Sequence, residues 1–189
     1  MTATRIGHQT GPVTDDSIVA TPLVTARLVL TPLTAADAET MVVVLADPAL
    51  YTFTGGGPPA LDELRVRYRR QVAGRSADGA ERWFNWVARR RDDDQAVGYL
   101  QATLSQGRSG AATIAELAWV IGTDWQARGY ATEGASAAAA WLQARGVGEL
   151  RAHIHPGHPA SEAVARRLGL SVTGVEVDGE RRWSRRLPL

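Results

Sequence analysis

Residues 115–134, AELAWVIGTDWQARGYATEG, decide the fold. The apolar residues that end at Ile121 predict a strand. The alanine-rich run over residues 129–145 predicts a helix, which ends before Gly146 because glycine is the usual residue just beyond a helix. The short loop over residues 126–131 therefore joins the end of a strand to the start of a helix.

That junction favours an anion site. The first backbone N–H groups of a helix have no intrahelical acceptor, and the positive end of the helix dipole lies beside them. Gly129 can take a positive φ and lets a phosphate approach the backbone, and Ala131 is small enough to leave this approach open. Arg128 adds a candidate bidentate phosphate contact. Taken alone, the stretch fits an ordinary turn equally well.

The rest of the chain alternates between strand and helix patterns around this junction. Hydrophobic periodicity and turn residues predict strands over 25–33, 83–89, 97–104, 111–121, 150–154, 172–177 and 181–187, and helices over 34–45, 61–72, 129–145 and 159–168. We expect an α/β fold in which helices cover both faces of one mixed sheet. The predicted domain spans residues 23–189, preceded by a flexible extension over residues 1–22.

Composition excludes several classes of site. The 189 residues contain no cysteine, and all 21 basic residues are arginine, which excludes disulfides, thiolate metal sites, a cysteine nucleophile and a Walker P-loop. The net charge of +1 argues against nucleic acid or an anionic membrane as partner. The arginine clusters are expected to be solvated faces because acidic residues balance them, with contact to ribosomal RNA as the alternative. No apolar run is long enough for a membrane span or a secretory signal, and we expect a cytoplasmic protein.

Several dispersed motifs resemble one known family. The stretch QARGYA at residues 126–131 resembles the Q/R-x-x-G-x-G/A pyrophosphate loop of the GNAT N-acetyltransferases. RGYATE after AELAWVI, TARLVL at residues 25–30, and ARRLGL at residues 165–170 are similar to the RimJ/RimL-type branch, whose best-known members acetylate protein N-termini. The resemblance covers residues 25–187 and implies a mostly antiparallel twisted sheet with a V-shaped splay that holds acetyl-CoA.

The resemblance also implies which residues hold acetyl-CoA. The backbone of Trp119, Val120 and Ile121 is expected to pair with the pantetheine arm in the manner of an added strand. The pyrophosphate is expected to lie on the backbone amides of the loop, with Thr132 in the first turn of the helix; the loop residues are Gln126, Ala127, Arg128, Gly129, Tyr130 and Ala131. No metal is expected to take part.

Glu116 is the candidate general base. Apolar Ala115 and Leu117 flank it, and a carboxylate in such surroundings would have a raised pKa and could deprotonate an amine. It also matches the glutamate that the RimJ/RimL branch often carries there. The alternative is a solvated carboxylate or one paired with an arginine.

The proton donor for the departing CoA thiolate is left open. Many GNAT enzymes carry a tyrosine four residues before the last-motif glycine, where this chain has Ala165. The branch suggests Ser161 as a hydrogen-bond or proton donor to the sulfur, although a helix-start hydroxyl that satisfies a backbone amide is an equal alternative. His158 replaces the usual asparagine, can donate to a pantetheine carbonyl, and is a second candidate acid.

His153 and His155 lie on one face of the predicted strand, but no carboxylate or cysteine lies near them in sequence, which argues against a metal site. On the acceptor side, the resemblance suggests that Tyr51, Phe53 and the adjacent triple glycine shape substrate entry. Of the aromatic residues at 83–86, Trp83 and Asn85 share one strand face and are the acceptor-side candidates, with the opposite pair as the alternative.

These observations predict an N-acetyltransferase in which a primary amine, of a protein N-terminus or of a small molecule, attacks acetyl-CoA directly in a ternary complex. The alternative is a non-catalytic acyl-CoA-binding or regulatory module, which the missing tyrosine and His158 motivate. Dimers are common in the family and exposed tryptophans would permit a homodimer, but the sequence does not decide the oligomeric state.

Overall fold

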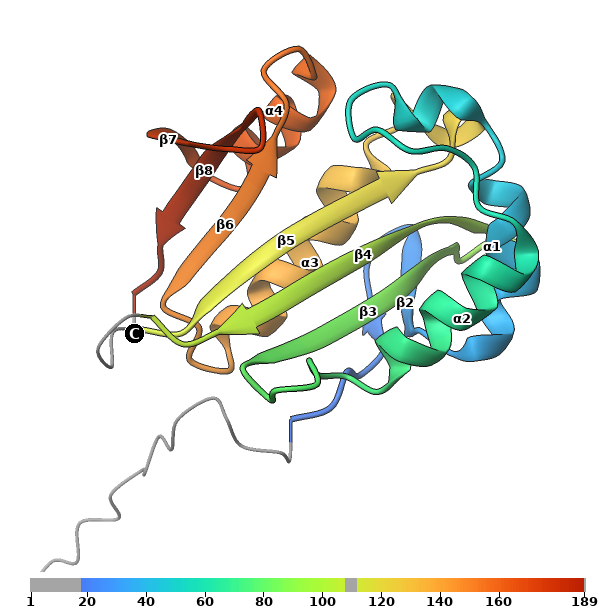
Figure 1. Ribbon diagram of the computed structural model, residues 1–189, viewed down its shortest axis with the longest axis horizontal. Coiled ribbons are helices and arrows are strands. Elements are labelled where there is room, and N and C mark those ends of the chain that lie inside the picture. Colours follow the sequence, from blue (N-terminus) through green and yellow to red (C-terminus); the bar gives the residue numbers. More distant parts are fainter. Residues whose placement is uncertain (1–17, 108–111, 189) are drawn as a thin grey trace, which may run out of the picture.

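The computed structural model describes residues 18–107 and 112–188, which form one eight-stranded sheet with four α-helices (Figure 1). The strands are β1 (Leu23–Val24), β2 (Leu28–Pro32), β3 (Glu81–Arg90), β4 (Ala96–Ser105), β5 (Ile114–Ile121), β6 (Glu149–Ile154), β7 (Ser171–Val177) and β8 (Glu180–Arg186). The helices are α1 (Ala38–Val44), α2 (Leu61–Val72), α3 (Tyr130–Gln143) and α4 (Pro159–Arg167). Short 3-10 helices cover Ala35–Asp37, Pro48–Tyr51 and Thr123–Trp125.

The sheet is antiparallel except at one pair of strands. Its order is β1-β2-β3-β4-β5-β6-β8-β7, and only β5 and β6 run parallel. Their pairing covers three residues on each strand, with Ile114 opposite Glu149 and Glu116 opposite Arg151. Beyond these residues the two strands separate, and β6, β8, β7 and α4 swing away from the rest of the sheet (Figure 1). The predicted fold class, including the V-shaped splay, is confirmed.

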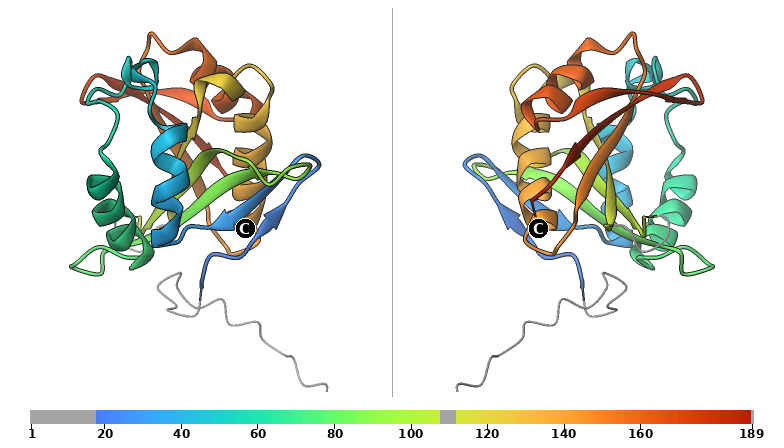
Figure 2. Two further views of the ribbon diagram at one scale, coloured as in Figure 1. Left: turned by 90° about the vertical axis from the view of Figure 1, so that its right-hand side faces the viewer. Right: turned by 90° about the vertical axis from the view of Figure 1, so that its left-hand side faces the viewer.

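Helices cover both faces of the sheet (Figure 2). On one face, α1 and α2 pack through Met41 and Leu64 onto Val87 of β3. On the other face, α3 packs through Ala135, Ala138 and Leu142 onto β2, β4 and β5. A Cβ built on Gly134 would lie 3.0 Å from Cδ2 of Leu100, so the small residues Gly134, Ala135 and Ala138 let this part of α3 lie close to the sheet.

The predicted order of elements is correct, and the structure adds one short strand. β1 pairs only Leu23 and Val24 with β2, which is too short for alternation to reveal. Of the predicted flexible extension, residues 1–17 lie outside the described residues. The residues that follow contact the core: Trp86 Nε1 donates to the Thr21 carbonyl at 2.9 Å, and Trp141 Nε1 donates to Thr21 Oγ1 at 2.8 Å.

The tryptophans do not form an exposed surface. All six are described, and each is buried or half-buried; Trp86, Trp141 and Trp183 belong to the core. The expectation of exposed tryptophans that would permit a dimer is therefore wrong, because these rings pack against the sheet and its helices. Within residues 18–107 and 112–188, the large hydrophobic residues that are exposed are valines.

Candidate active site

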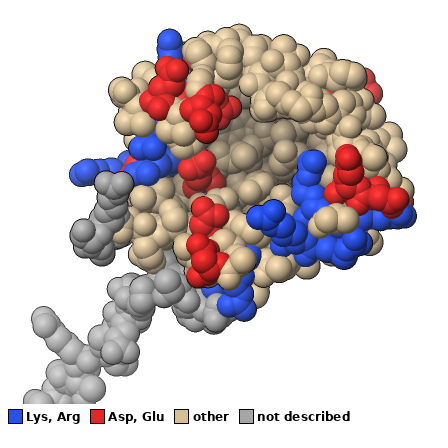
Figure 3. Space-filling model, viewed as in Figure 1, with Lys and Arg blue, Asp and Glu red and all other residues tan. Residues whose placement is uncertain are grey.

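The separation of β5 from β6 opens a cavity of about 870 Å³. Because pairing ends at Glu116, the edge of β5 from Leu117 onward faces this cavity instead of a neighbouring strand. Trp119, Val120 and Ile121, the residues predicted to pair with pantetheine, all line it. Figure 3 shows the hollow in the middle of this face, with acidic side chains along one margin.

One end of the cavity is formed by the loop before α3. Ala127 and Gly129 both have positive φ, 59° and 81°. In this backbone conformation the N–H groups of residues 127–132 have no acceptor among the described residues. The first hydrogen bond of the helix is donated by the Glu133 N–H to the Gly129 carbonyl at 3.0 Å. Six free amides beside the positive end of a 14-residue helix are an anion-binding arrangement.

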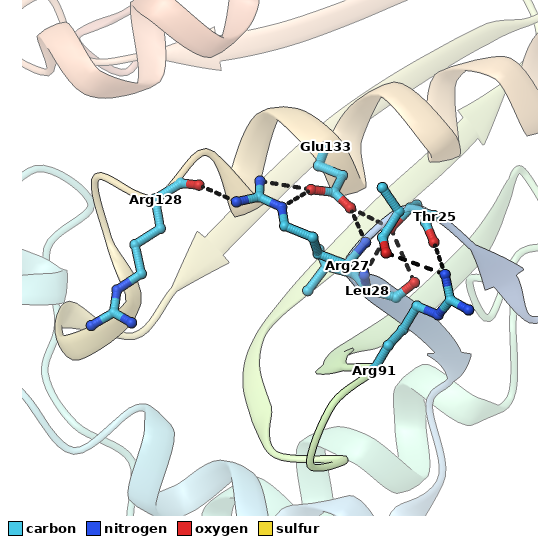
Figure 4. Close-up of polar contacts among 7 residues, drawn as sticks. Thr25, Arg27, Leu28, Arg91, Arg128 and Glu133 are labelled. Atoms are coloured by element: carbon cyan, nitrogen blue, oxygen red, sulfur yellow. Dashed lines mark hydrogen bonds and ion pairs between the residues drawn. The ribbon is translucent and has the colours of Figure 1, made fainter.

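A polar network outside the loop holds it in place (Figure 4). The Arg27 guanidinium pairs with Glu133 of α3, with Nε to Oε2 and Nη2 to Oε2 each 2.7 Å. Its Nη1 donates to the Arg128 carbonyl at 2.9 Å, and the guanidinium lies 4.8 Å from the centre of the Tyr130 ring. Thr25 Oγ1 and the Arg27 backbone N–H donate to Glu133 Oε1. The sequence analysis used Arg27 only as part of the TARLVL motif, and no sequence pattern indicated that it would hold the loop before α3.

Two loop side chains have roles other than those expected. Arg128 does not line the cavity; its guanidinium lies over the Trp125 ring at 4.9 Å, with Arg90 at 4.8 Å from the same ring. The Arg128 side chain therefore lies outside the cavity lining, and its phosphate contact stays a prediction. Gln126 lines the cavity, and its Nε2 donates to the Ile121 carbonyl at 3.0 Å, which closes the turn. Tyr130, Ala131 and Thr132 line the cavity as well.

Glu116 lines the cavity, but its surroundings differ from those predicted. Its side chain is 49% exposed, and the flanking Ala115 and Leu117 are buried on the opposite face of β5. The expectation of an apolar environment is wrong, because neighbours in a strand point away from each other. Its Oε1 lies 3.0 Å from Nδ1 of His153 on β6, a partner 37 positions away that the sequence did not connect with it.

Ser161 and His158 lie on the side of the cavity formed by α4. Ser161 is in the first turn of α4, and His158 precedes the helix. The His158 ring stacks on Phe53 at 4.4 Å between centroids, so two lining residues from distant parts of the chain are in contact. Burial lowers the pKa of His158, and the nearby His155 lowers it further. The imidazole is therefore neutral at neutral pH.

The position of the missing tyrosine is occupied by Ala165, which has no hydroxyl and is fully buried in the core. The cavity is instead lined by a tyrosine that sequence reasoning missed, Tyr99 of β4, which lies opposite Val120 of β5. Burial raises the pKa of the Tyr99 phenol and outweighs the lowering effect of the Arg67 charge, so the hydroxyl is protonated at neutral pH. Glu180 of β8 also lines the cavity and was missed.

The four acceptor-side candidates are not brought together. Phe53 lines the cavity, whereas Tyr51 does not and uses its hydroxyl to donate to the Leu45 carbonyl at 3.0 Å. Trp83 and Asn85 line a separate cavity of about 400 Å³ between β3 and the end of α2. The expectation that they share a site with Phe53 is wrong, because the face of β3 that carries them lies under α2. Leu50, Gln101 and Thr103 line the large cavity instead.

No cluster of three metal-ligating side chains occurs within residues 18–107 and 112–188. His153 and His155 have other partners: His153 meets Glu116, and His155 Nδ1 accepts from the Gly157 N–H at 3.0 Å. Among the described residues no helix has the length and hydropathy to cross a membrane.

Comparisons with known proteins agree with this geometry. The sequence profile of the Acetyltransferase (GNAT) domain matches residues 27–171. No curated protein sequence matches significantly. Among solved structures, RimL, a ribosomal-protein α-N-acetyltransferase in complex with coenzyme A, superposes with a TM-score of 0.72 at 15% identity over 88% of this chain and 98% of its own.

Two other structures show the same fold. An acetyltransferase from Agrobacterium tumefaciens has a TM-score of 0.67 at 24% identity, covering 89% of this chain and 95% of its own. MccE, a microcin self-immunity acetyltransferase in complex with acetyl-CoA and AMP, has a TM-score of 0.64 at 11% identity, covering 86% of this chain and 93% of its own.

Proposed function

Because the chain belongs to the GNAT acetyltransferase family, we propose that it transfers an acetyl group from acetyl-CoA to a primary amine, as RimJ/RimL-type enzymes do. Family membership makes the chain an acetyl-CoA-dependent acetyltransferase. The acceptor, the branch and the residues named below are our proposal. The observation that carries it is one cavity, at the splay of β5 and β6, that has unbonded backbone amides at one end and a carboxylate, Glu116, on its wall.

The binding of acetyl-CoA is assigned to two backbone features. The free amides of residues 127–132 fit a pyrophosphate, which needs several N–H donors and tolerates no large side chain at Gly129. The unpaired edge of β5 from Leu117 to Ile121 offers peptide groups to the amides of the pantetheine arm, as a sheet edge does to an added strand. When bound, acetyl-CoA supplies the activated thioester.

The chain's own residues supply the proton transfers. Glu116 takes a proton from the incoming ammonium group, directly or through water, so that the nitrogen lone pair is free to form the new C–N bond. The C–S bond then breaks and the sulfur takes up a proton. Ser161, Tyr99 and His158 line the cavity with O–H or N–H groups and are the candidate donors. The sequence contains no cysteine to carry the acetyl group, so the amine attacks directly.

Charge in the cavity favours a cationic acceptor. Glu116 and Glu180 both line it, whereas the one arginine in its lining, Arg167, lies at the far end of α4. A protonated primary amine would be attracted to the two carboxylates before it loses its proton. This class includes protein N-termini and small-molecule amines.

The first experiment is calorimetric titration of the full chain with acetyl-CoA and with free CoA. We expect micromolar binding of both, followed by thiol release when amine acceptors are added. The variant Glu116→Gln should retain acetyl-CoA affinity and lose turnover on the order of 10²-fold or more, as removal of a general base does. Absence of binding by either ligand would overturn the assignment of the cofactor site.

A second candidate function rests on Ala165 and His158, which stand where many relatives have catalytic or ligand-binding residues. It is a regulatory module that binds acyl-CoA without turnover. Acetyl-CoA binding with no thiol release for any of a panel of peptide and small-molecule amines, in wild type and in Glu116→Gln alike, would favour this function over transfer.

A further inference from the structure

Three side chains from three strands form a hydrogen-bonded row beside the cavity. Nε of Arg182 on β8 lies 3.3 Å from Nε2 of His153 on β6, and Nδ1 of His153 lies 3.0 Å from Oε1 of Glu116 on β5. The sheet register sets this row, because His153 is directly opposite Arg182 in the β6–β8 pairing. On β6, Arg151 lies two residues before His153 on the same face, and Arg151 is opposite Glu116 of β5.

Chemistry fixes the direction of both hydrogen bonds. A guanidinium has only donors and is not deprotonated in proteins, so Nε2 of His153 must accept from Arg182. The proton of a neutral imidazole is then on Nδ1, and Nδ1–H donates to Glu116 Oε1. A second proton on Nε2 would place two N–H donors against each other. The hydrogen bonds therefore run from Arg182 through His153 to Glu116, whose Oε1 accepts the last one.

We infer that His153, oriented by Arg182, is a positioning residue that holds the Glu116 carboxyl group in place and aims its free oxygen into the cavity. This inference rests on the proposed role of Glu116 as general base. The His153 side chain is 17% exposed while Glu116 is 49% exposed, so the imidazole is the packed support and the carboxylate is the accessible end. His153 cannot itself be the base, because both of its ring nitrogens are engaged.

The other charges on this face leave the row intact. Arg151, the register partner of Glu116, is held by Glu149 through two hydrogen bonds of 2.6 and 3.0 Å. Its charge still acts on Glu116 from a distance. Glu180 lines the cavity at the start of β8, and no hydrogen bond or ion pair joins it to Arg182, His153 or Glu116. The single hydrogen-bond donor to Glu116 among the described residues is His153.

A matched pair of variants tests the role of this donor. In His153→Asn the side-chain amide can place an N–H near the position of Nδ1, whereas His153→Leu fills similar space without a donor. We expect kcat/KM to fall roughly 10- to 100-fold in His153→Leu, by analogy with residues that orient metal ligands, and to recover to within about threefold of wild type in His153→Asn. The affinity for acetyl-CoA should be unchanged in both.

The split between kcat and KM separates positioning from packing. Without the donor the carboxyl group is no longer aimed at the amine, so kcat should fall in His153→Leu while the KM for acetyl-CoA stays unchanged, and His153→Asn should restore kcat. Equal loss of kcat in the two variants would overturn the inference. If Glu116→Gln keeps full turnover, the proposed base itself fails; if Glu116→Gln is inactive and His153→Leu is not, only the positioning role fails.

A measurement on the unaltered protein needs no turnover. Nitrogen-15 NMR of histidine-labelled full-length chain at neutral pH reports which ring nitrogen carries the proton, and the spectrum of His153→Asn identifies the His153 signals. We expect a neutral ring protonated at Nδ1. A ring protonated at Nε2, or at both nitrogens, would contradict the row.

Discussion

Arg27 and Glu133 are 106 positions apart in sequence and form a side-chain ion pair with an Nε to Oε2 distance of 2.7 Å. The same arginine donates to the carbonyl of Arg128 inside the loop before α3. The chain just before β2 therefore fixes the first turn of α3 and the loop whose free amides face the cavity. The conformation of that loop depends on a partner outside it.

Replacing Arg27 should weaken acetyl-CoA binding. In Arg27→Met the loop loses its hydrogen bond at Arg128 and α3 loses its ion pair, so the free amides are no longer held in position. We expect Kd to rise about tenfold, which is ~1.4 kcal/mol. Arg91→Met is the control, since Arg91 donates to the carbonyls of Thr25 and Ala26 in the same turn without touching the loop. Equal affinities in the two variants by calorimetry would contradict the role assigned to Arg27.

The Glu133 carboxylate should make stability depend on acidic pH. Burial acts to raise its pKa, but hydrogen bonds from Thr25 and Arg27 outweigh burial and leave the pKa below its ordinary value of 4.5. A carboxyl whose pKa is lowered by folding stabilises the protein fully above 4.5, and this contribution is lost as pH falls through the lowered value.

Chemical denaturation across the acidic range tests this linkage. The free energy of unfolding of wild type should fall more steeply below pH 4.5 than that of Glu133→Gln, which has no proton to take up at this position. Parallel curves for the two proteins would show that Glu133 does not titrate in the way its contacts require.

Gly129 should tolerate no branched side chain. Its φ is 81°, a region that costs other residues roughly 1–2 kcal/mol, and an added Cβ would lie 3.4 Å from Nη2 of Arg27. Gly129→Val should abolish acetyl-CoA binding while the chain remains folded. Gly146→Val is matched for backbone strain, with φ of 78° and no atom within 4 Å of an added Cβ, and lies at the other end of α3. It should bind as wild type does.

Ser161 should matter for turnover more than for binding. If its hydroxyl donates to the departing sulfur, Ser161→Ala should lower kcat on the order of 10²-fold with little change in the acetyl-CoA KM, since the interaction forms as charge develops. Ser161→Thr keeps a hydroxyl and should retain most of the activity. Steady-state thiol-release assays on both variants make the comparison, and an unaffected Ser161→Ala would leave Tyr99 and His158 as the candidate donors.

Local patterns predicted most of the fold. Alternation and helical spacing predicted the strands and helices in the right order. Core residues such as Leu28, Ala135 and Leu142 recur along their elements with the period of a strand or of a helix. The splay of β5 from β6 came from the family resemblance, since pairing that stops after Glu116 has no signature in a single strand. β1 was missed because two residues carry no period.

The candidate site was predicted only in part. The loop amides and Glu116 lie in the cavity as expected, because their positions follow from one continuous segment, residues 115–134. The partners of these groups were not predictable: Arg27 and His153 come from distant parts of the chain, and a polar pair has no periodic pattern to reveal it. Trp83 and Asn85 were placed wrongly because strand alternation says which residues share a face but not which helix covers that face.

The early end of the β5–β6 pairing means that the folded chain contains two open sheet edges in its interior. A ligand that fills this gap binds the folded protein and not the unfolded chain, so its concentration becomes a determinant of stability by mass action. At a hundred times Kd, acetyl-CoA would add about 2.7 kcal/mol to the free energy of unfolding. The melting temperature of this protein would then report the acetyl-CoA supply of the solution around it.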